Sequence, residues 1–242
     1  MIRILFHGLT DVGLKRSNNE DMLAMESSLG YWAVADGMGG AAAGEVASCI
    51  FIETACEVFS KGLPNGTPKD LVGAVFASAN AKIISEATRH PELEGMGCTA
   101  ELLTFQGEEY HLGHVGDSRT YLYRSGQLRQ ITKDHSFVQE QVDKGLMTRE
   151  EARTNLYKNV IIRAVGVNEG FAIDFIKGRV LEGDVFLLCT DGLTDMVDDP
   201  TIQETLGLPH DLRRKAEKLV ELAKLGGGRD NITLVLCQAA LS

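Results

Sequence analysis

Short apolar or alternating apolar and polar runs dominate this chain, and turns rich in glycine, asparagine and aspartate separate them. Runs of this kind are typical of β-strands. They predict strands over residues 2–10, 21–25, 31–35, 98–105, 109–115, 118–123, 128–131, 171–179, 184–190 and 232–238. Because short turns such as Gln106-Gly107 and Ser125-Gly126 join neighbouring strands, we expect antiparallel sheets.

A helical period replaces the strand pattern in three places. Apolar residues recur every three or four positions after Gly44, over 68–89 and over 211–225. Pro68 suits the first turn of the second helix. The run Gly226-Gly227-Gly228 ends the third helix. Two helices are therefore predicted before the long series of strands and one before the last strand.

Residues 134–158 form a polar insertion between strands, where we expect a mobile surface flap. Its residues 137–144 and 148–153 predict two short helices, and Thr148 and Glu151 have the spacing of a capping box. No linker divides the chain, so we expect one domain over residues 1–242. Grouped helices and long runs of strands predict an α+β fold, a four-layer α/β/β/α sandwich of two antiparallel sheets flanked by helices.

Composition excludes several classes of protein. A formal net charge of −10 argues against a nucleic-acid binder, which needs a basic face. The amino terminus lacks the pattern of a signal peptide and no stretch is long enough to span a membrane, so we expect a cytoplasmic protein. The five cysteines lie at irregular spacings among apolar neighbours, which favours free thiols in a reducing compartment over disulfides or a zinc site.

Two predicted strands run into an Asp-Gly pair that no second strand follows, at Asp36-Gly37 and at Asp191-Gly192. An Asp-Gly pair after an apolar run usually marks a tight hairpin, and a hairpin needs a returning strand. Carboxylates held at strand ends beside glycine suit a hard cation better than a turn. Both pairs are therefore candidates for a metal site.

Four segments of this kind lie at predicted strand edges: 16–21, 36–40, 191–195 and 229–231. Each segment alone is better explained as a turn, but four together favour a common site. Two carboxylates about 4 Å apart repel by roughly 4 kcal/mol at an effective dielectric of about 20, so a cluster implies a compensating cation. Oxygen ligands without histidine favour Mn²⁺ or Mg²⁺ over Zn²⁺.

Five motifs, in order between about residues 8 and 238, together resemble one known family. They are Arg16-x3-Glu20-Asp21, Ala35-Asp36-Gly37-Met38-Gly39-Gly40, Gly116-Asp117-Ser118-Arg119, Cys189-Thr190-Asp191-Gly192-Leu193-x-Asp195 and Arg229-Asp230-Asn231. The pattern is similar to that of the metal-dependent protein phosphatases (type 2C, PPM), and most similar to the stand-alone bacterial serine/threonine phosphatases. Residues 131–137 and 164–166 also resemble the flap region of bacterial members.

The resemblance implies a role for each motif. Asp36 would bridge two metal ions, and the carbonyl of Gly37 would bind one of them. Asp191 and Asp230 would bind the other metal ion. Glu20 and Asp21 would act nearby through water, and Arg16 would bind the phosphate with its planar fork. Asp117 and Asp195 match positions of a third, weaker metal ion, although Asp117 is equally well explained as a turn residue.

Three departures from the family pattern concern proton delivery and substrate handling. Met38 stands where eukaryotic members have a histidine that serves as general acid. Ala41 stands where bacterial members usually have histidine, and Asn155-Leu156 replaces a His-Pro pair. None of these residues is a proposed ligand. Among the histidines, we expect His114 to be a satisfied core or interface residue rather than a ligand.

The resemblance implies a signalling enzyme that hydrolyses phosphoserine and phosphothreonine by direct attack of a hydroxide that bridges two Mn²⁺ or Mg²⁺ ions. Its partners would be phosphorylated proteins, the substrates of a serine/threonine protein kinase, and we expect a monomer. Two alternatives stay open. A small-molecule phosphoesterase would share every metal ligand but ignore phosphopeptides. A silent phosphoprotein-binding domain would be expected to have lost an aspartate or the arginine, and every proposed ligand is present here.

Overall fold

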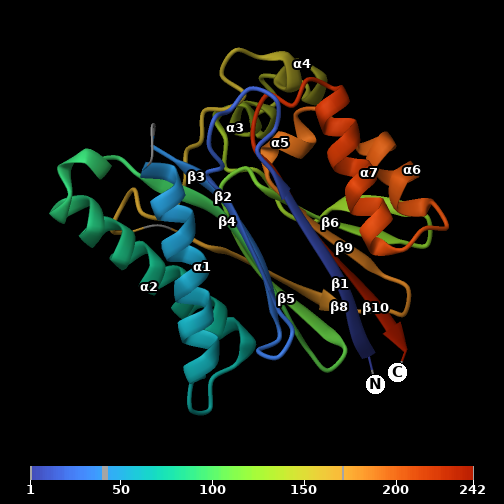
Figure 1. The fold of residues 1–242 in the computed structure, drawn as a ribbon, viewed down its shortest axis with the longest axis horizontal. Coiled ribbons are helices and arrows are strands. Elements are labelled where there is room, and N and C mark those ends of the chain that lie inside the picture. The colour runs from blue at the N-terminus through green and yellow to red at the C-terminus, as the bar shows by residue number, and fades with distance from the viewer. Residues whose placement is uncertain (1, 40–42, 171, 242) are drawn as a thin grey trace.

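Two five-stranded sheets stacked face to face form the centre of the molecule in our computed structural model, which describes residues 2–39, 43–170 and 172–241 (Figure 1). The first sheet has the order β1 (Ile2–Asp11), β10 (Ile232–Leu241), β9 (Val185–Cys189), β6 (Arg119–Arg124) and β7 (Gln127–Gln130). The second has the order β2 (Asp21–Glu26), β3 (Tyr31–Met38), β4 (Gly97–Gln106), β5 (Glu109–Val115) and β8 (Asp174–Arg179). All neighbouring strands are antiparallel, as expected.

Helices cover the outer face of each sheet and complete the predicted four layers (Figure 1). The second sheet carries α1 (Ala43–Lys61) and α2 (Pro68–Arg89), followed by the short 3₁₀ turn η1 (Pro91–Leu93). The first sheet carries α5 (Asp191–Thr194), α6 (Asp199–Gly207) and α7 (Leu212–Leu225). The expected α+β sandwich is thereby confirmed.

Three apolar clusters hold the layers together. Phe51 of α1 and Phe76 of α2 pack on the second sheet, and their rings lie 5.0 Å apart. Leu219 of α7 belongs to the cluster between the helices and the first sheet. Trp32 and Phe186 belong to the cluster between the two sheets. Each sheet is thus apolar on both faces, which explains the nearly continuous apolar runs of β3, β4 and β9.

The structure shifts several element boundaries. The first Asp-Gly pair lies within β3 rather than beyond its end, because β4 extends to Gly97 and pairs with Met38. The second pair opens the short helix α5, which was not predicted. Helix α6 was also not predicted, and β8 begins only at Asp174. Residue 171, where the predicted strand began, and Ala41 lie outside the described residues.

Two helices occupy the predicted flap, α3 (Phe137–Asp143) and α4 (Arg149–Thr154). The predicted capping box of α4 is confirmed, since Glu151 accepts the Thr148 backbone N–H at 2.8 Å and Thr148 Oγ1 accepts from Glu151 N. Along the described stretches, none of the helices combines the length and apolar character needed to cross a bilayer. All five cysteines are free thiols.

Candidate metal centre

Asp21 and Asp36 face each other across the pair of strands β2 and β3. Asp21 is the first residue of β2 and is only 3% exposed. The hydroxyl of Thr190, the residue directly after β9, donates to Asp21 Oδ2 at 2.9 Å. A residue at the end of a strand of the first sheet therefore orients a carboxylate of the second sheet. This cross-strand pairing brings together two of the predicted site residues.

Asp191 and Asp230 lie next to strands of the first sheet: Asp191 opens α5 two residues after β9, and Asp230 lies two residues before β10. The charge of each disfavours the ionised form of Asp36 and so adds to the raised pKa of that carboxyl. The two sheets therefore bring carboxylates from both halves of the sandwich to one end of the molecule. The prediction that distant segments gather here agrees with this geometry.

Asn231 ties the loop before β2 to the start of β10. Its Oδ1 accepts the backbone N–H of Glu20 at 2.8 Å, and its Nδ2 donates to the carbonyls of Val12 at 3.1 Å and Asn18 at 2.9 Å. In the sequence, Asn231 belongs to the Arg229-Asp230-Asn231 motif, which by itself predicts no role for its side chain. Its position directly after Asp230 was the available signal, yet the partners 211 and more residues away appear only in the fold.

The glycine of each Asp-Gly pair allows a close backbone approach. A Cβ on Gly37 would lie 2.1 Å from the carbonyl oxygen of Gly44 in α1. A Cβ on Gly192 would lie 1.8 Å from the carbonyl oxygen of Asn231. Neither position therefore has room for a side chain. Their role is to let the start of α1 and the start of β10 pack against the carboxylate-bearing segments.

The clustered carboxylates disfavour one another's charge. Burial raises the pKa of Asp36 well above its ordinary value, and repulsion from Asp21 and Asp191 adds to this, although Asp36 keeps a solvent-accessible face. Burial raises the pKa of Asp21 to about 7, against hydrogen bonds from Thr233 and Thr190. Burial and repulsion from Asp195 and Asp230 raise the pKa of Asp191 to about 6. Bound cations would relieve this repulsion.

These groups fit hard divalent cations by their chemistry. The five carboxylates of Asp21, Asp36, Asp117, Asp191 and Asp230 are linked by mutual repulsion. Oxygen donors of this kind suit Mn²⁺ or Mg²⁺. Within the described ranges, no three such side chains already converge as a ready-made cation cage.

Arg16 and Glu20 lie at the border of the carboxylate group. Arg16 Nη2 donates to Asp230 Oδ2 at 2.7 Å, and its side chain is half-exposed. This hydrogen bond raises the pKa of Arg16, and the charges of Asp230, Glu20 and Asp36 contribute further. Glu20 Oε1 accepts from Asn18 at 3.0 Å, while its backbone carbonyl accepts from Ser48 of α1 at 2.6 Å.

Asp117 and Asp195 lie where the two ends of the flap meet the sandwich. Burial raises the pKa of Asp117 well above its ordinary value, and the charges of Asp191 and Asp134 act in the same direction. Lys158, the last residue of the flap, forms an ion pair with Asp195. His114 is fully buried and hydrogen-bonded, as expected for a core residue.

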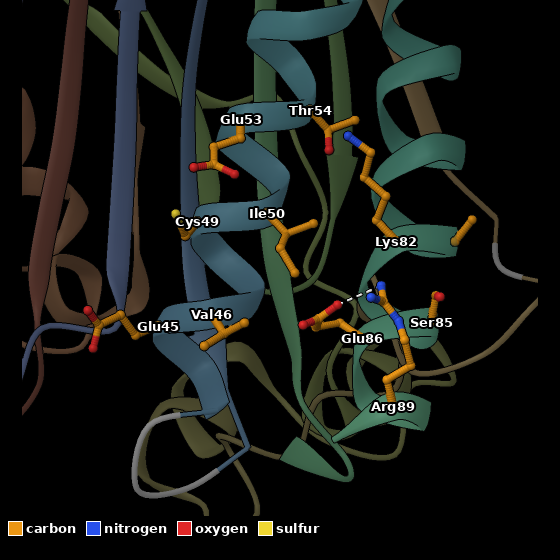
Figure 2. A pocket seen from close by; sticks show the side chains of 11 residues that line it. Glu45, Val46, Cys49, Ile50, Glu53, Thr54, Lys82, Ser85, Glu86 and Arg89 are labelled. Atoms are coloured by element: carbon orange, nitrogen blue, oxygen red, sulfur yellow. Dashed lines mark ion pairs between the residues drawn. The ribbon is translucent and has the colours of Figure 1, made fainter. Parts of the chain in front are cut away.

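A groove of about 720 Å³ lies elsewhere, between α1 and α2 (Figure 2). Its lining includes Val46 and Ile50 together with the charged residues Lys82, Glu86 and Arg89. Glu86 and Arg89 form an ion pair of 2.7 Å across one turn of α2. None of the carboxylates predicted to bind metal lines this groove, so it is separate from the candidate metal centre.

Comparison with known proteins identifies a family that this chain resembles over most of its length. The family model described as Protein phosphatase 2C matches residues 15–223. The serine/threonine protein phosphatase PstP of Mycobacterium tuberculosis is 42% identical over 227 residues, which cover 94% of this chain but 43% of that protein. The serine/threonine phosphatase Stp of Listeria monocytogenes is 33% identical over 239 residues, which cover 96% of this chain and 95% of that protein. The chain thus spans less than half the length of the mycobacterial relative.

Solved structures agree over the whole chain. A crystal structure of the Mycobacterium tuberculosis phosphatase PstP/Ppp superposes with a TM-score of 0.92 at 40% identity, covering 100% of both chains. The catalytic domain of PstP in complex with two manganese ions gives a TM-score of 0.90 at 39% identity, again over 100% of both chains. The phosphatase Stp1 of Staphylococcus aureus gives 0.89 at 30% identity, covering 100% of this chain and 96% of that one.

Proposed function

The chain belongs to the protein phosphatase 2C family, and we propose on that basis that it is a metal-dependent protein serine/threonine phosphatase. One structural observation carries the proposal beyond family membership. Carboxylates from both sheets gather at one end of the sandwich, and burial and mutual repulsion raise the pKa values of Asp36, Asp21 and Asp191. Such an arrangement is costly without cations, and it lies beside a half-exposed arginine.

In this proposal, Asp36, Asp191, Asp230 and the Gly37 carbonyl hold two Mn²⁺ or Mg²⁺ ions, and Glu20 and Asp21 adjoin them through water. A two-metal site supplies Lewis-acid stabilisation and a water nucleophile of lowered pKa. Thr190 keeps the Asp21 carboxylate in place through its hydroxyl. The manganese-bound relative supports the choice of ion, and the oxygen-only donor set allows magnesium as well.

Arg16 binds the phosphoryl group of the substrate. Its guanidinium is half-exposed and reaches the carboxylates from the loop before β2. A planar fork holds two phosphoryl oxygens at once and stabilises the charge that they gain as the ester bond breaks. Met38 has no proton to give to the leaving serine or threonine oxygen, so water in the site supplies it.

The flap, residues 134–158, favours a protein substrate over a small phosphoester. One of its ends lies beside Asp117 and the other reaches Asp195, so it borders the carboxylate group. A polypeptide that flanks a phosphorylated residue would contact α3 and α4, whereas a small phosphoester would not. We propose phosphoproteins made by a serine/threonine protein kinase as substrates, and a weaker third ion at Asp117 and Asp195.

The free cysteines fit action in a reducing cytoplasm. We also propose that the protein acts there as a monomer. The test of the main proposal is hydrolysis of an aryl phosphate and of a phosphothreonine peptide, with Mn²⁺ or Mg²⁺ and with excess chelator. Metal-dependent hydrolysis of both substrates supports the proposal. Full activity in chelator would overturn it, and activity on the aryl phosphate alone would favour a small-molecule phosphoesterase.

A further inference from the structure

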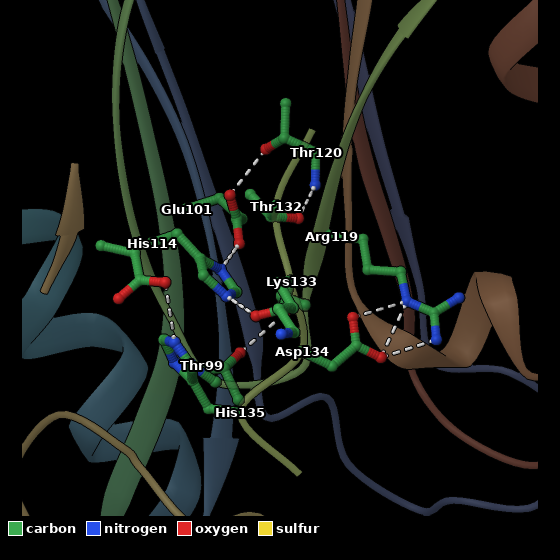
Figure 3. Close-up of polar contacts among 12 residues, drawn as sticks. Thr99, Glu101, His114, Arg119, Thr120, Thr132, Lys133, Asp134 and His135 are labelled. Carbon is green, nitrogen blue, oxygen red and sulfur yellow. Dashed lines mark hydrogen bonds and ion pairs between the residues drawn. The ribbon is translucent and has the colours of Figure 1, made fainter. Parts of the chain in front are cut away.

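We infer that the buried pair Glu101 and His114 positions Asp117, and that it does so by holding the entrance of the flap, residues 133–136. The inference rests on the proposed function, in which Asp117 lies at a weaker metal position. Neither residue belongs to the carboxylate group or touches substrate. Both are positioning residues, and Figure 3 shows their contacts with Thr120 and Lys133 beside the contact of Arg119 with Asp134.

The turn that carries Asp117 is bonded to the flap entrance on both sides. Before Asp117, the Gly116 backbone N–H donates to His135 Nδ1 at 3.0 Å, and the His135 N–H donates to the Gly116 carbonyl at 2.7 Å. After Asp117, Arg119 donates to both carboxylate oxygens of Asp134 at 2.6 to 3.0 Å. Any shift of residues 134–135 would therefore move the backbone around Asp117.

His114 holds Lys133, the first residue of the flap entrance. Its Nε2 lies 2.8 Å from the carbonyl oxygen of Lys133 and must carry a proton, because the carbonyl has none to give. Its Nδ1 contacts a carboxylate oxygen of Glu101, the residue directly opposite across β4 and β5. The other Glu101 oxygen accepts from the Thr120 hydroxyl at 2.6 Å. The ring is thus fixed from both ends.

The two side chains of this pair are fully buried. Burial raises the pKa of Glu101, and the Glu101 carboxylate raises the pKa of His114 against the effect of its own burial. One proton therefore stays on the pair. A buried ion pair of this kind adds little net stability compared with an apolar pair of the same shape. Its value here is directional, since it fixes which way His114 points its second N–H.

His135 completes the connection. Its ring lies against the ring of His114, with centroids 4.5 Å apart and the ring planes tilted by 35°. Nδ1 accepts the Gly116 N–H, while Nε2 lies 2.9 Å from Arg163 Nη1 and 3.3 Å from a carboxylate oxygen of Asp174. Arg163 in turn donates to Asp174 at 2.9 Å. The two imidazoles thereby join β5, the flap entrance and the start of β8.

The test uses a neutral pair that conserves shape, Glu101→Gln with His114→Phe. The first readout is amide hydrogen exchange in the metal-free full chain. We expect exchange to accelerate at residues 116–118 and 133–136 by roughly tenfold or more, while β10 stays protected. The matched control is Arg124→Gln, which removes a partly buried ion pair with Asp184 at the far end of β6. Equal acceleration in all strands would overturn the inference.

The second readout is a double-mutant cycle with Asp117→Asn, measured as kcat/KM at saturating Mn²⁺. The neutral pair should lower kcat/KM by roughly tenfold to a hundredfold in the parent and leave it almost unchanged beside Asp117→Asn. The same loss in both backgrounds would overturn the inference, because it would show a general structural defect. If the neutral pair does not fold, Arg119→Gln, which cuts the second link to Asp134, must show the same non-additivity. A parent without any phosphatase activity would defeat the proposed function, and hydrogen exchange would still decide the positioning role.

Discussion

The side chains of Arg16 and Asp230, 214 residues apart in the sequence, form a 2.7 Å ion pair at the edge of the carboxylate group. It joins the proposed phosphate-binding residue to a proposed metal ligand. A cation bound at Asp230 would compete with the guanidinium for the same carboxylate. Metal binding would thereby free the fork of Arg16 for the phosphoryl group of the substrate.

Arg16→Ala should raise KM for both an aryl phosphate and a phosphopeptide. A hydrogen bond between charged groups contributes about 1.5–3 kcal/mol, so kcat/KM should fall by about tenfold to a hundredfold. Arg16→Lys keeps the charge without the planar fork, so its kcat/KM should lie between those of the parent and of Arg16→Ala. Steady-state kinetics at saturating Mn²⁺ check this, and an unchanged KM in Arg16→Ala would refute the phosphate-binding role.

Asp36→Asn should abolish turnover while the metal-free protein unfolds at the same or a higher temperature. The loss of turnover should exceed the roughly 10- to 100-fold effect typical of residues that only orient ligands. Stability should not suffer, because the carboxylate repels Asp21 and Asp191. Thermal unfolding in chelator and kinetics in Mn²⁺ measure the two effects. Asp211→Asn, which keeps a good N-cap on α7, is the control and should leave both unchanged.

Mn²⁺ should stabilise the fold. At a hundred times its dissociation constant, one bound ion adds about 2.7 kcal/mol to the free energy of unfolding, which corresponds to roughly 5–10 °C in Tm. The effect should disappear with excess chelator and shrink in Asp191→Asn. If Tm does not change at Mn²⁺ concentrations that give full activity, this result would contradict the proposed ligands.

His135 should make the protein less stable in mild acid. Burial, together with the charges of His114 and Arg163, lowers the pKa of His135 to about 4. An ordinary histidine in the unfolded chain titrates near 6.5, so between these two pKa values the unfolded state binds more protons than the folded state. The free energy of unfolding therefore decreases as the pH is lowered. Denaturant titrations at pH 7 and pH 5 should show about 2 kcal/mol more loss in the parent than in His135→Asn. Equal losses would mean that the ring of His135 is not held neutral.

Charge reversal in the flap should separate protein substrates from small ones. Lys144→Glu and Arg153→Glu change exposed residues of the flap and should alter kcat/KM for a phosphopeptide while sparing an aryl phosphate. Lys61→Glu, at the end of α1, is the matched control. If both activities of the flap variants fall in parallel, the flap shapes the metal centre, and its role in reading the substrate has to be dropped.

The sequence predicts those helices that have a clear start signal and a regular period of apolar residues. Helix α2 begins at Pro68 with a capping box between Thr67 and Asp70, so its bounds match the predicted range. Helix α6 was missed because only Ile202 and Leu206 among its apolar residues are buried, too few for a clear helical period. Strand β3 was cut short at the Asp-Gly pair, because its last residues are held by pairing with β4 rather than by their own composition.

The sequence names the candidate site residues, but not the contacts that connect them. Family motifs point to Asp36, Asp191 and Asp230, whose charges influence one another in the structure, and their roles as ligands stay predictions. The role of Asn231 depends on carbonyls of the loop before β2. The pairing of Glu101 with His114 depends on the register of β4 and β5, which apolar patterns alone do not specify.

The pairing of β1 with β10 has a consequence for synthesis on the ribosome. Ile2 lies opposite Leu241, and β10 is the neighbour of β1 in its sheet. β1 therefore has no β10 to pair with until residues 232–241 have been synthesised, whereas β2 to β5 lie close to one another in the sequence. Asp21 and Asp36, which face each other across β2 and β3, are synthesised long before Asp191 and Asp230. The repulsion of Asp36 by Asp191 and Asp230 can therefore begin only after residue 230 has been synthesised.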